Sequence, residues 1–214
     1  MTQTLIRKMV TELIGTFGLV FTVCCTVIQH QALAPLAIGA SLMVAVFAGG
    51  HISGAHYNPA VTLAVFLRGR LPAREVVPYW IAQLAGASVA SGLAIYVTRA
   101  SVDNPAAYTG RAAGSAFTAE LIVTFALAYV VLNVATSKSH PNNSFYGLAI
   151  GFTVFAGAVA VGGISGGAFN PAVALGAMIA GLTGWGNAWI YLVACLGGAA
   201  LAAYTFRFLN PDDK

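Results

Sequence analysis

Two asparagine residues, Asn58 and Asn170, are each followed by Pro-Ala and stand roughly half a chain length apart. Asparagine is a favoured helix N-cap and proline a favoured first helical residue, so each Asn-Pro pair predicts the start of a helix. When asparagine caps a helix, its side-chain oxygen accepts a backbone N–H and its NH2 group is left as a donor. These residues therefore predict hydrogen-bond donation to a neutral acceptor.

Both asparagines lie within a longer sequence motif that occurs twice, as GHISGAHYNPAVTLA at residues 50–64 and as GGISGGAFNPAVALG at residues 162–176. Further matches occur in the same order: Glu12-Leu13-Ile14 with Glu120-Leu121-Ile122, Ala37-Ile38-Gly39 with Ala149-Ile150-Gly151, and Gly86-Ala87 with Gly198-Ala199. We therefore expect a single domain, residues 1–214, built from two repeats at about 9–100 and 116–208.

The composition places this repeat in a membrane. The chain is 58% apolar and 7% charged, with a mean hydropathy of +0.81, whereas soluble domains carry about 25% charged residues. A spanning helix needs about 20 mostly apolar residues, and six stretches qualify: about 9–29, 35–50, 77–98, 116–136, 145–162 and 187–208. Segments 59–67 and 171–181 begin at the Asn-Pro pairs and reach only the midplane. The prediction is an all-α membrane protein with six transmembrane helices and two re-entrant half-helices.

Positive charge is distributed unevenly in this arrangement. With a cytoplasmic N-terminus, Arg99 and Arg111 fall outside, and the remaining cations fall inside: Arg7, Lys8, Arg68, Arg70, Arg74, Lys138, Arg207 and Lys214. This bias predicts cytoplasmic N- and C-termini in the plasma membrane. The net charge of +4 is then attributed to membrane anchoring, not to a nucleic-acid partner. Each repeat holds three spans, so the second is inverted, and inverted repeats place a shared site near the membrane centre.

The two half-helices should enter from opposite faces and meet in the middle. Each helix N-terminus carries roughly half an elementary charge, so two positive ends and two asparagine donors converge there and disfavour cations. The preceding segments are rich in glycine: Gly49, Gly50 and Gly54 in the first repeat, and Gly162, Gly163, Gly166 and Gly167 in the second. Non-helical backbone at membrane depth must be buried or line a wet cavity. We expect these glycines in loops that expose carbonyl groups to a pore.

With NPA motifs at Asn58-Pro59-Ala60 and Asn170-Pro171-Ala172 in inverted halves, the whole chain resembles the major intrinsic proteins, the aquaporin and aquaglyceroporin family. The resemblance implies a pore through each protomer and a homotetramer in the lipid bilayer. The predicted function is a passive channel for water and small uncharged solutes that excludes ions and protons. It is not an enzyme and uses no cofactor.

Two acidic residues, Glu12 and Glu120, lie inside the predicted spans, and an intramembrane carboxylate is functional by default. In similar proteins this glutamate holds the re-entrant loop by accepting its backbone N–H groups, and we favour that scaffold role over proton relay. The resemblance also implies that His56 lines the cytoplasmic half of the pore. We expect His51 to hold the loop by hydrogen bonding. A metal site is not predicted, because three ligands in closed geometry are not evident.

The chain departs from water-selective relatives at one position. They carry arginine three residues after the second NPA asparagine, where this chain has Val173. By the same register the other constriction residues are Ile38, Ala158 and Gly167. This apolar, uncharged filter predicts that small neutral solutes pass together with water. In the alternative, Phe47 or Tyr57 narrows the pore and the channel is selective for water.

Two other function classes stay open at this point. Inverted repeats and broken helices also serve secondary transporters, and a membrane scaffold with a closed pore is the second rival. Glycerol, urea, ammonia, hydrogen peroxide and metalloid hydroxides all suit an apolar filter, and the sequence does not choose among them. Cys24, Cys25 and Cys195 are expected to be buried thiols, and Trp185, Trp189 and Tyr191 to form an interfacial aromatic belt.

Overall fold

The computed structural model describes residues 3–99, 102 and 104–213. Eight α-helices are seen there: α1 (Gln3–Ile28), α2 (Ala34–Ser53), α3 (Pro59–Leu67), α4 (Ala73–Thr98), α5 (Gly110–Val131), α6 (Tyr146–Ser165), α7 (Pro171–Ile179) and α8 (Ala188–Leu209). A π-helical turn η1 (Leu132–Thr136) extends α5, and a 3-10 turn η2 (Trp185–Asn187) precedes α8. Six of these segments are long and apolar enough to span a membrane, while α3 and α7 are short. The predicted fold class is confirmed.

The ends of α2 and α6 differ from the prediction. Both helices continue to Ser53 and Ser165, so Gly49, Gly50, Gly162 and Gly163 are helical and not in loops. Each helix stops at a left-handed glycine, Gly54 with φ 88° and Gly166 with φ 85°, whose N–H bonds the carbonyl four residues earlier. This cap needs a residue that tolerates positive φ, so Gly54 and Gly166 end the helices while the glycines before them stay helical.

The other boundaries agree more closely. The expected half-helix 59–67 has the same limits as α3, and α7 ends two residues before the expected 181. Helix α4 begins at Ala73 rather than 77, which places Glu75 in its first turn, paired with Lys8 at 2.8 Å. Residue 100 of the first repeat and Lys214 of the predicted cytoplasmic charges lie outside the described residues.

The two repeats pack in equivalent ways. Helix α1 lies against α4, α5 against α8, and α2 against α6 across the molecule. A Cβ atom at Gly86 would lie 2.5 Å from the Leu13 carbonyl oxygen, and one at Gly198 would lie 2.5 Å from that of Leu121. Glycine is therefore required where the paired backbones approach each other, as in other membrane helix pairs.

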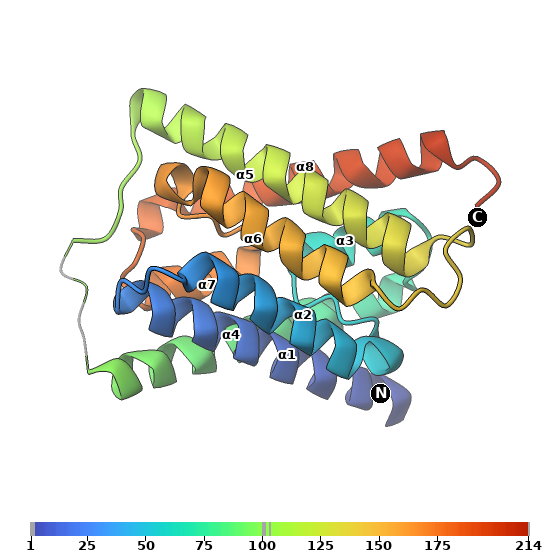
Figure 1. Ribbon diagram of the computed structural model, residues 1–214, viewed down its shortest axis with the longest axis horizontal. Coiled ribbons are helices and arrows are strands. Elements are labelled where there is room, and N and C mark those ends of the chain that lie inside the picture. Colours follow the sequence, from blue (N-terminus) through green and yellow to red (C-terminus); the bar gives the residue numbers. More distant parts are fainter. Residues whose placement is uncertain (1–2, 100–101, 103, 214) are drawn as a thin grey trace.

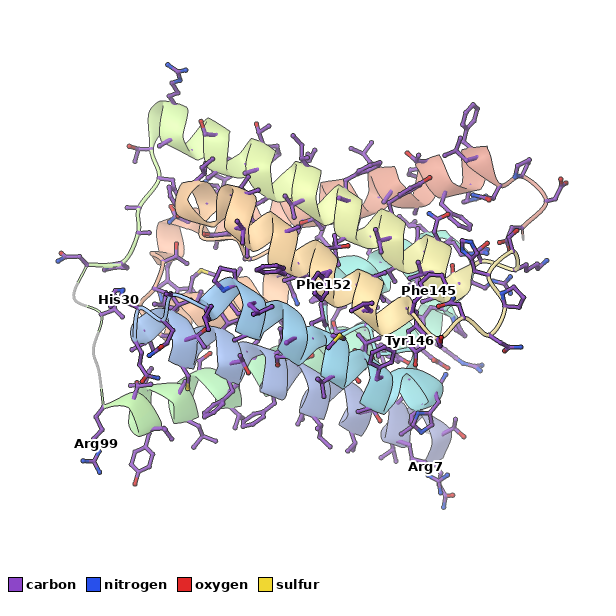
Figure 2. The ribbon with its side chains drawn as sticks, viewed as in Figure 1. Arg7, His30, Arg99, Phe145, Tyr146 and Phe152 are labelled. Carbon is purple, nitrogen blue, oxygen red and sulfur yellow. The ribbon has the colours of Figure 1, made fainter. Side chains whose placement is uncertain are left out.

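The ribbon has both chain ends on the same side, and the half-helices lie inside the bundle (Figure 1). Arg7 projects at the end that holds the termini, while Arg99 and His30 lie at the opposite end (Figure 2). The two termini lie on the same side because each half has three spanning segments, and an even total number of spans returns the chain to the side on which it started.

Candidate functional site

The two NPA asparagines meet at the centre of the bundle. Each caps its half-helix through the side-chain oxygen, which accepts the N–H of Ala60 or Ala172 at 2.8 Å. The NH2 groups then cross between the repeats: Asn58 Nδ2 donates to the Phe169 carbonyl and Asn170 Nδ2 to the Tyr57 carbonyl, both at 2.9 Å. The sequence predicted the caps and the donors, but not these acceptors.

These crossed bonds use one N–H of each amide and leave the other for the lumen. The N-termini of α3 and α7 face the same region, so their partial positive charges add to the two remaining donors. A neutral acceptor such as a hydroxyl or carbonyl oxygen is stabilised at this point, and a cation is not.

Both asparagines line a central cavity of about 320 Å³. The four residues expected at the constriction, Ile38, Ala158, Gly167 and Val173, line the same cavity, as do His56 and Gly166. The structure thus brings these residues around one space. Gly54 lies instead on the side of the chain termini, in a second cavity described below.

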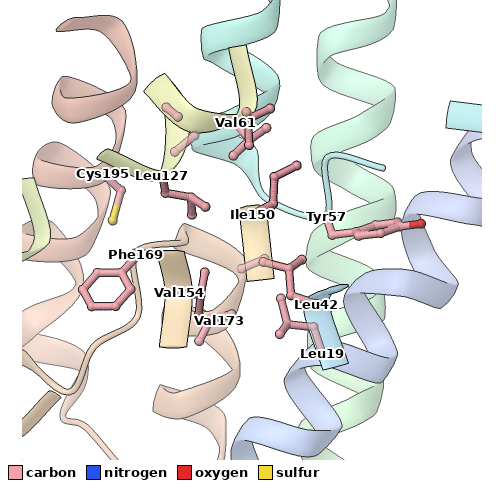
Figure 3. Packing of buried hydrophobic residues seen from close by; sticks show 14 of the residues in the cluster. Leu19, Leu42, Tyr57, Val61, Leu127, Ile150, Val154, Phe169, Val173 and Cys195 are labelled. Carbon is pink, nitrogen blue, oxygen red and sulfur yellow. The ribbon is translucent and has the colours of Figure 1, made fainter. Parts of the chain in front are cut away.

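Most of the central cavity wall is apolar and repeats itself about the molecular centre. Residues at matching places in the two repeats line it in pairs: Leu19 and Leu127, Val23 and Val131, Ile38 and Ile150, Leu42 and Val154, and Val61 and Val173. In Figure 3, Val173 lies next to Val154, and Leu19 next to Leu42. Val173 is therefore the counterpart of Val61, and the apolar part of the wall is alike on both sides of the asparagines.

Phe47 and Tyr57, the alternative narrowing residues, do not line this cavity. The Tyr57 ring is buried behind the loop, where its hydroxyl donates to the Ala45 carbonyl at 3.0 Å. Phe47 is 41% exposed and packs edge-on against Tyr146. That form of the alternative is wrong, because both rings point away from the lumen.

Glu12 holds the first re-entrant loop. Its Oε1 accepts from Ser53 Oγ at 2.7 Å and from the His56 N–H at 2.9 Å. Its Oε2 accepts from the Tyr57 N–H at 2.6 Å and from Gln83 Nε2 at 2.8 Å. The carboxylate thus fixes two consecutive backbone groups directly before Asn58, and the expected hydrogen bonds from the loop are present.

Glu120 makes the equivalent contacts in the second repeat. Its Oε1 accepts from Ser165 Oγ at 2.7 Å and the Ala168 N–H at 3.0 Å, and its Oε2 accepts from the Phe169 N–H at 2.6 Å. Cys195 Sγ takes the place of Gln83, at 3.6 Å from Oε2. Both glutamates are fully buried, so each loop is held by a carboxylate that has only donors around it.

The two histidines of the first motif have different surroundings. His56 is buried and lines the cavity, with Nδ1 at 3.2 Å from Thr62 Oγ1. His51 is exposed on the last turn of α2 and forms no hydrogen bond with any described residue. The expectation that His51 supports the loop is wrong, because α2 extends past it and the loop starts only at Gly54.

Sequence reasoning missed several residues that support the loops. Tyr79 and Tyr191 donate their hydroxyls to the carbonyls of Ser53 and Ser165, each at 2.7 Å. Tyr191 is therefore buried and not part of an aromatic belt, whereas Trp185 and Trp189 are exposed. The matching positions of the tyrosines in the two repeats were a signal for this role. Gln83 was a second signal, since a polar amide within an apolar span needs a partner.

A second cavity, of about 440 Å³, lies on the side of the chain termini and shares His56 and Val131 with the central cavity. Its wall includes Ser137 and Lys138, which follow η1. These shared residues make it the vestibule of the same pore. His56 stands at the junction of the two spaces.

The C-terminal segment is fastened beside this vestibule by Asp213. Its Oδ1 accepts from Arg68 Nη2 at 2.6 Å and Arg70 Nη2 at 3.2 Å, and its Oδ2 accepts from Ser137 Oγ and the Lys138 N–H. Burial alone would raise the pKa of Asp213, but these hydrogen bonds outweigh it and hold the pKa well below its usual range. Arg68, one of the charges expected on the cytoplasmic side, has a side chain that is 1% exposed.

All three cysteines are free thiols. Cys24 and Cys195 are buried as expected, and Cys25 is partly exposed. Among the described residues no group of three His, Cys, Asp or Glu side chains could hold a metal ion.

Residues 1–206 match the family model described as Major intrinsic protein. The chain is 38% identical to glycerol uptake facilitator protein-like 6 of Lactiplantibacillus plantarum, over 97% of this chain and 100% of that relative. It is 35% identical to aquaporin NIP1-1 of Oryza sativa subsp. japonica, over 98% of this chain and 76% of that protein. The aquaglyceroporin structure from Plasmodium falciparum has the same fold, with a TM-score of 0.78, 23% identity, and coverage of 94% and 95% of the two chains. This chain therefore belongs to the major intrinsic protein family of membrane channels.

Proposed function

We propose that this channel conducts small uncharged solutes together with water, through a filter formed by Ile38, Ala158, Gly167 and Val173. The single observation that carries the proposal is the position of Val173, which lines the central cavity where a positively charged side chain would otherwise stand. Valine offers no donor to replace a solute's lost hydration and no charge to exclude a cation. Selection at this filter then depends on size and dewetting.

Exclusion of ions is assigned to the centre of the pore, not to the filter. The N-termini of α3 and α7 and the free amide N–H groups of Asn58 and Asn170 all present positive partial charge there. Because none of these groups depends on Val173, cation leakage should stay low whatever stands at that position.

Similar proteins bear names that agree with this proposal. One relative is called a glycerol uptake facilitator-like protein and another an aquaporin. A secondary transporter is disfavoured, because both intramembrane acids are surrounded by loop donors and neither is free to bind a coupling ion.

The test is paired flux measurement on wild type and Val173→Arg in proteoliposomes. We expect the arginine to lower glycerol and urea permeability by about tenfold, which corresponds to about 1.4 kcal/mol in the barrier, while water flow is retained. Val173→Met is the matched control, because it adds length without charge or donors and should lower water and solute flow together. A wild type that passes only water, or an unchanged solute-to-water ratio in Val173→Arg, would overturn the proposal.

We also infer a homotetramer with both termini in the cytoplasm of a cell whose plasma membrane it spans. One outer groove of about 580 Å³ is lined by α1 and α2, and another of about 510 Å³ by α5 and α6. Small residues dominate both, including Gly18 and Ala40 in the first and Ala156 and Ala160 in the second. Head-to-tail contact of two different faces closes a ring. Native mass spectrometry should give four copies, and protease added to intact cells should leave both termini uncut.

A further inference from the structure

A chain of polar side chains leads from Glu12 to the lumen. Gln83 Nε2 donates to Glu12 Oε2 at 2.8 Å and to Thr62 Oγ1 at 2.9 Å. The Thr62 hydroxyl donates to the Asn58 carbonyl at 3.0 Å, and His56 Nδ1 lies 3.2 Å from the same Thr62 oxygen. Gln83 and Thr62 are fully buried, so no solvent competes for these contacts.

The positions of the protons along this hydrogen-bonded chain are determined by Glu12, at its buried end. All the neighbours of the Glu12 carboxylate are donors, so the amide of Gln83 must turn its NH2 group towards it. Gln83 Oε1 is left without a hydrogen-bond partner among the described residues. Turning the amide over would place this oxygen against the carboxylate, and repulsion between them holds the orientation. The second N–H of Gln83 is therefore donated to Thr62.

Thr62 then determines the tautomer of His56. A hydroxyl has one proton and two lone pairs. If the proton goes to the Asn58 carbonyl, Thr62 Oγ1 accepts from both Gln83 and a protonated His56 Nδ1, and three hydrogen bonds are made. If Thr62 instead donates to His56 Nδ1, the bond from its hydroxyl to Asn58 is lost and two remain. The arrangement with Nδ1–H is favoured by one bond.

The other ring nitrogen of His56, Nε2, is the one available to the lumen. His56 lines both the central cavity and the vestibule, and it is the only ionisable side chain among the described residues that line the central cavity. Its ring is kept in place by Tyr79, with centroids 5.1 Å apart. With the proton on Nδ1, the neutral imidazole turns an unprotonated Nε2 towards the path of the solute.

The second repeat has no such chain. The residues that occupy the places of His56, Thr62 and Gln83 are Ala168, Ala174 and Cys195. The hydrogen bonds of Glu120 therefore end at the Cys195 thiol, 3.6 Å away, and no polar side chain among the described residues connects this carboxylate to the lumen. The same scaffold carboxylate holds both loops, but only in the cytoplasmic half do its hydrogen bonds continue to the pore wall.

We propose that the chain Glu12, Gln83, Thr62 and His56 locks His56 as the Nδ1–H tautomer, so that Nε2 is a hydrogen-bond acceptor for solutes that carry O–H or N–H groups. The acceptor stands between the central cavity and the vestibule, beyond the donors of the two asparagines. A solute that leaves those donors thus meets an acceptor next. This inference rests on the proposed channel function but names a further selecting residue and its positioning residues.

Solid-state NMR of protein labelled with 15N and 13C histidine in bilayers tests it without any flux measurement. At about pH 8, where imidazoles are largely neutral, we expect the His56 signal, assigned by difference from His56→Asn, to show Nδ1 protonated. Polarisation transferred from water should reach Nε2. In Thr62→Val the ratio of Nδ1–H to Nε2–H should fall about fivefold, the value of one hydrogen bond of about 1 kcal/mol.

Thr16→Val is the matched control, since Thr16 is also buried near Glu12 and its hydroxyl has no hydrogen-bond partner among the described residues. It should leave the His56 spectrum unchanged. A wild type with Nε2 protonated, or a Thr62→Val spectrum identical to wild type, would overturn the proposal. If Thr62→Val does not fold, the wild-type spectrum alone decides. A negative result here leaves the channel proposal standing, because that proposal depends only on flux.

Discussion

Replacing Glu12 with glutamine removes the charge of this side chain while keeping its shape. On Oε1 the donors are Ser53 Oγ and the His56 N–H, and on Oε2 they are the Tyr57 N–H and Gln83 Nε2. Glutamine has one acceptor oxygen, so its NH2 group must face one of these two pairs. Ser53 Oγ or the Gln83 amide can turn to accept from this NH2 group, because hydroxyl and amide groups both have lone pairs, but the backbone N–H of His56 or Tyr57 beside it loses its acceptor. One hydrogen bond to a charged group is then lost, and we expect Glu12→Gln to destabilise the fold by about 1.5–3 kcal/mol.

The equivalent change at Glu120 is the matched comparison. A glutamine there can turn its NH2 group towards Phe169 and Cys195, whose sulfur lies 3.6 Å away and is a weak acceptor. Only one strong bond, from the Phe169 N–H, is lost. We therefore expect Glu120→Gln to cost about 1.5–3 kcal/mol, the same range as at Glu12.

Reversible unfolding of both variants in mixed detergent micelles, followed by circular dichroism, measures these two costs. Water flux at matched protein density then reports whether the loop still shapes the pore. The reasoning is refuted if one of the two variants costs several times as much as the other, or if Glu12→Gln leaves both stability and flux at the wild-type level.

At the α1–α4 contact, Gly86→Ala should destabilise by about 1–3 kcal/mol, because the new methyl group meets the Leu13 carbonyl; Gly92→Ala in the same helix has open space and should not. Equal unfolding midpoints would contradict this. Asp213→Asn should release the C-terminal segment from Arg68, seen as faster carboxypeptidase digestion. In wild type the pKa of Asp213 is lowered in the folded protein, so this contact is fully present above about pH 4, the ordinary carboxyl pKa. The contact is lost as the pH falls towards the pKa of Asp213 in the folded protein. Digestion that is independent of pH from 7 to about 2 would contradict this expectation.

The half-helices were predictable because their starting signal is local. Asn58 and Pro59 supply the cap and the first residue from adjacent positions, and the structure begins α3 at that proline. Glu12 was predictable for a different reason, since a carboxylate inside an apolar span must find donors. In both cases the residue type alone indicates the hydrogen-bond partners that the side chain needs, without knowledge of distant parts of the chain.

The C-terminal end of α2 and the position of His51 were not predicted correctly, because a glycine in a membrane helix can either allow close packing or end the helix. Gly49 is helical and lies against Tyr57, whereas Gly54 adopts positive φ and ends the helix. Which glycine does which depends on neighbours that are distant in sequence. Contacts such as that of Arg68 with Asp213, 145 positions apart, have no local signal at all.

The crossed bonds of Asn58 and Asn170 have a consequence for the ancestry of the chain. Each repeat supplies the carbonyl that the other repeat's asparagine needs, so neither half can complete the centre alone. A single ancestral unit could have formed both bonds only as an antiparallel homodimer, inserted in the membrane in two opposite orientations. Two co-expressed half-chains, divided between α4 and α5, should rebuild the same centre, and a change to one asparagine should be felt in the half that does not contain it.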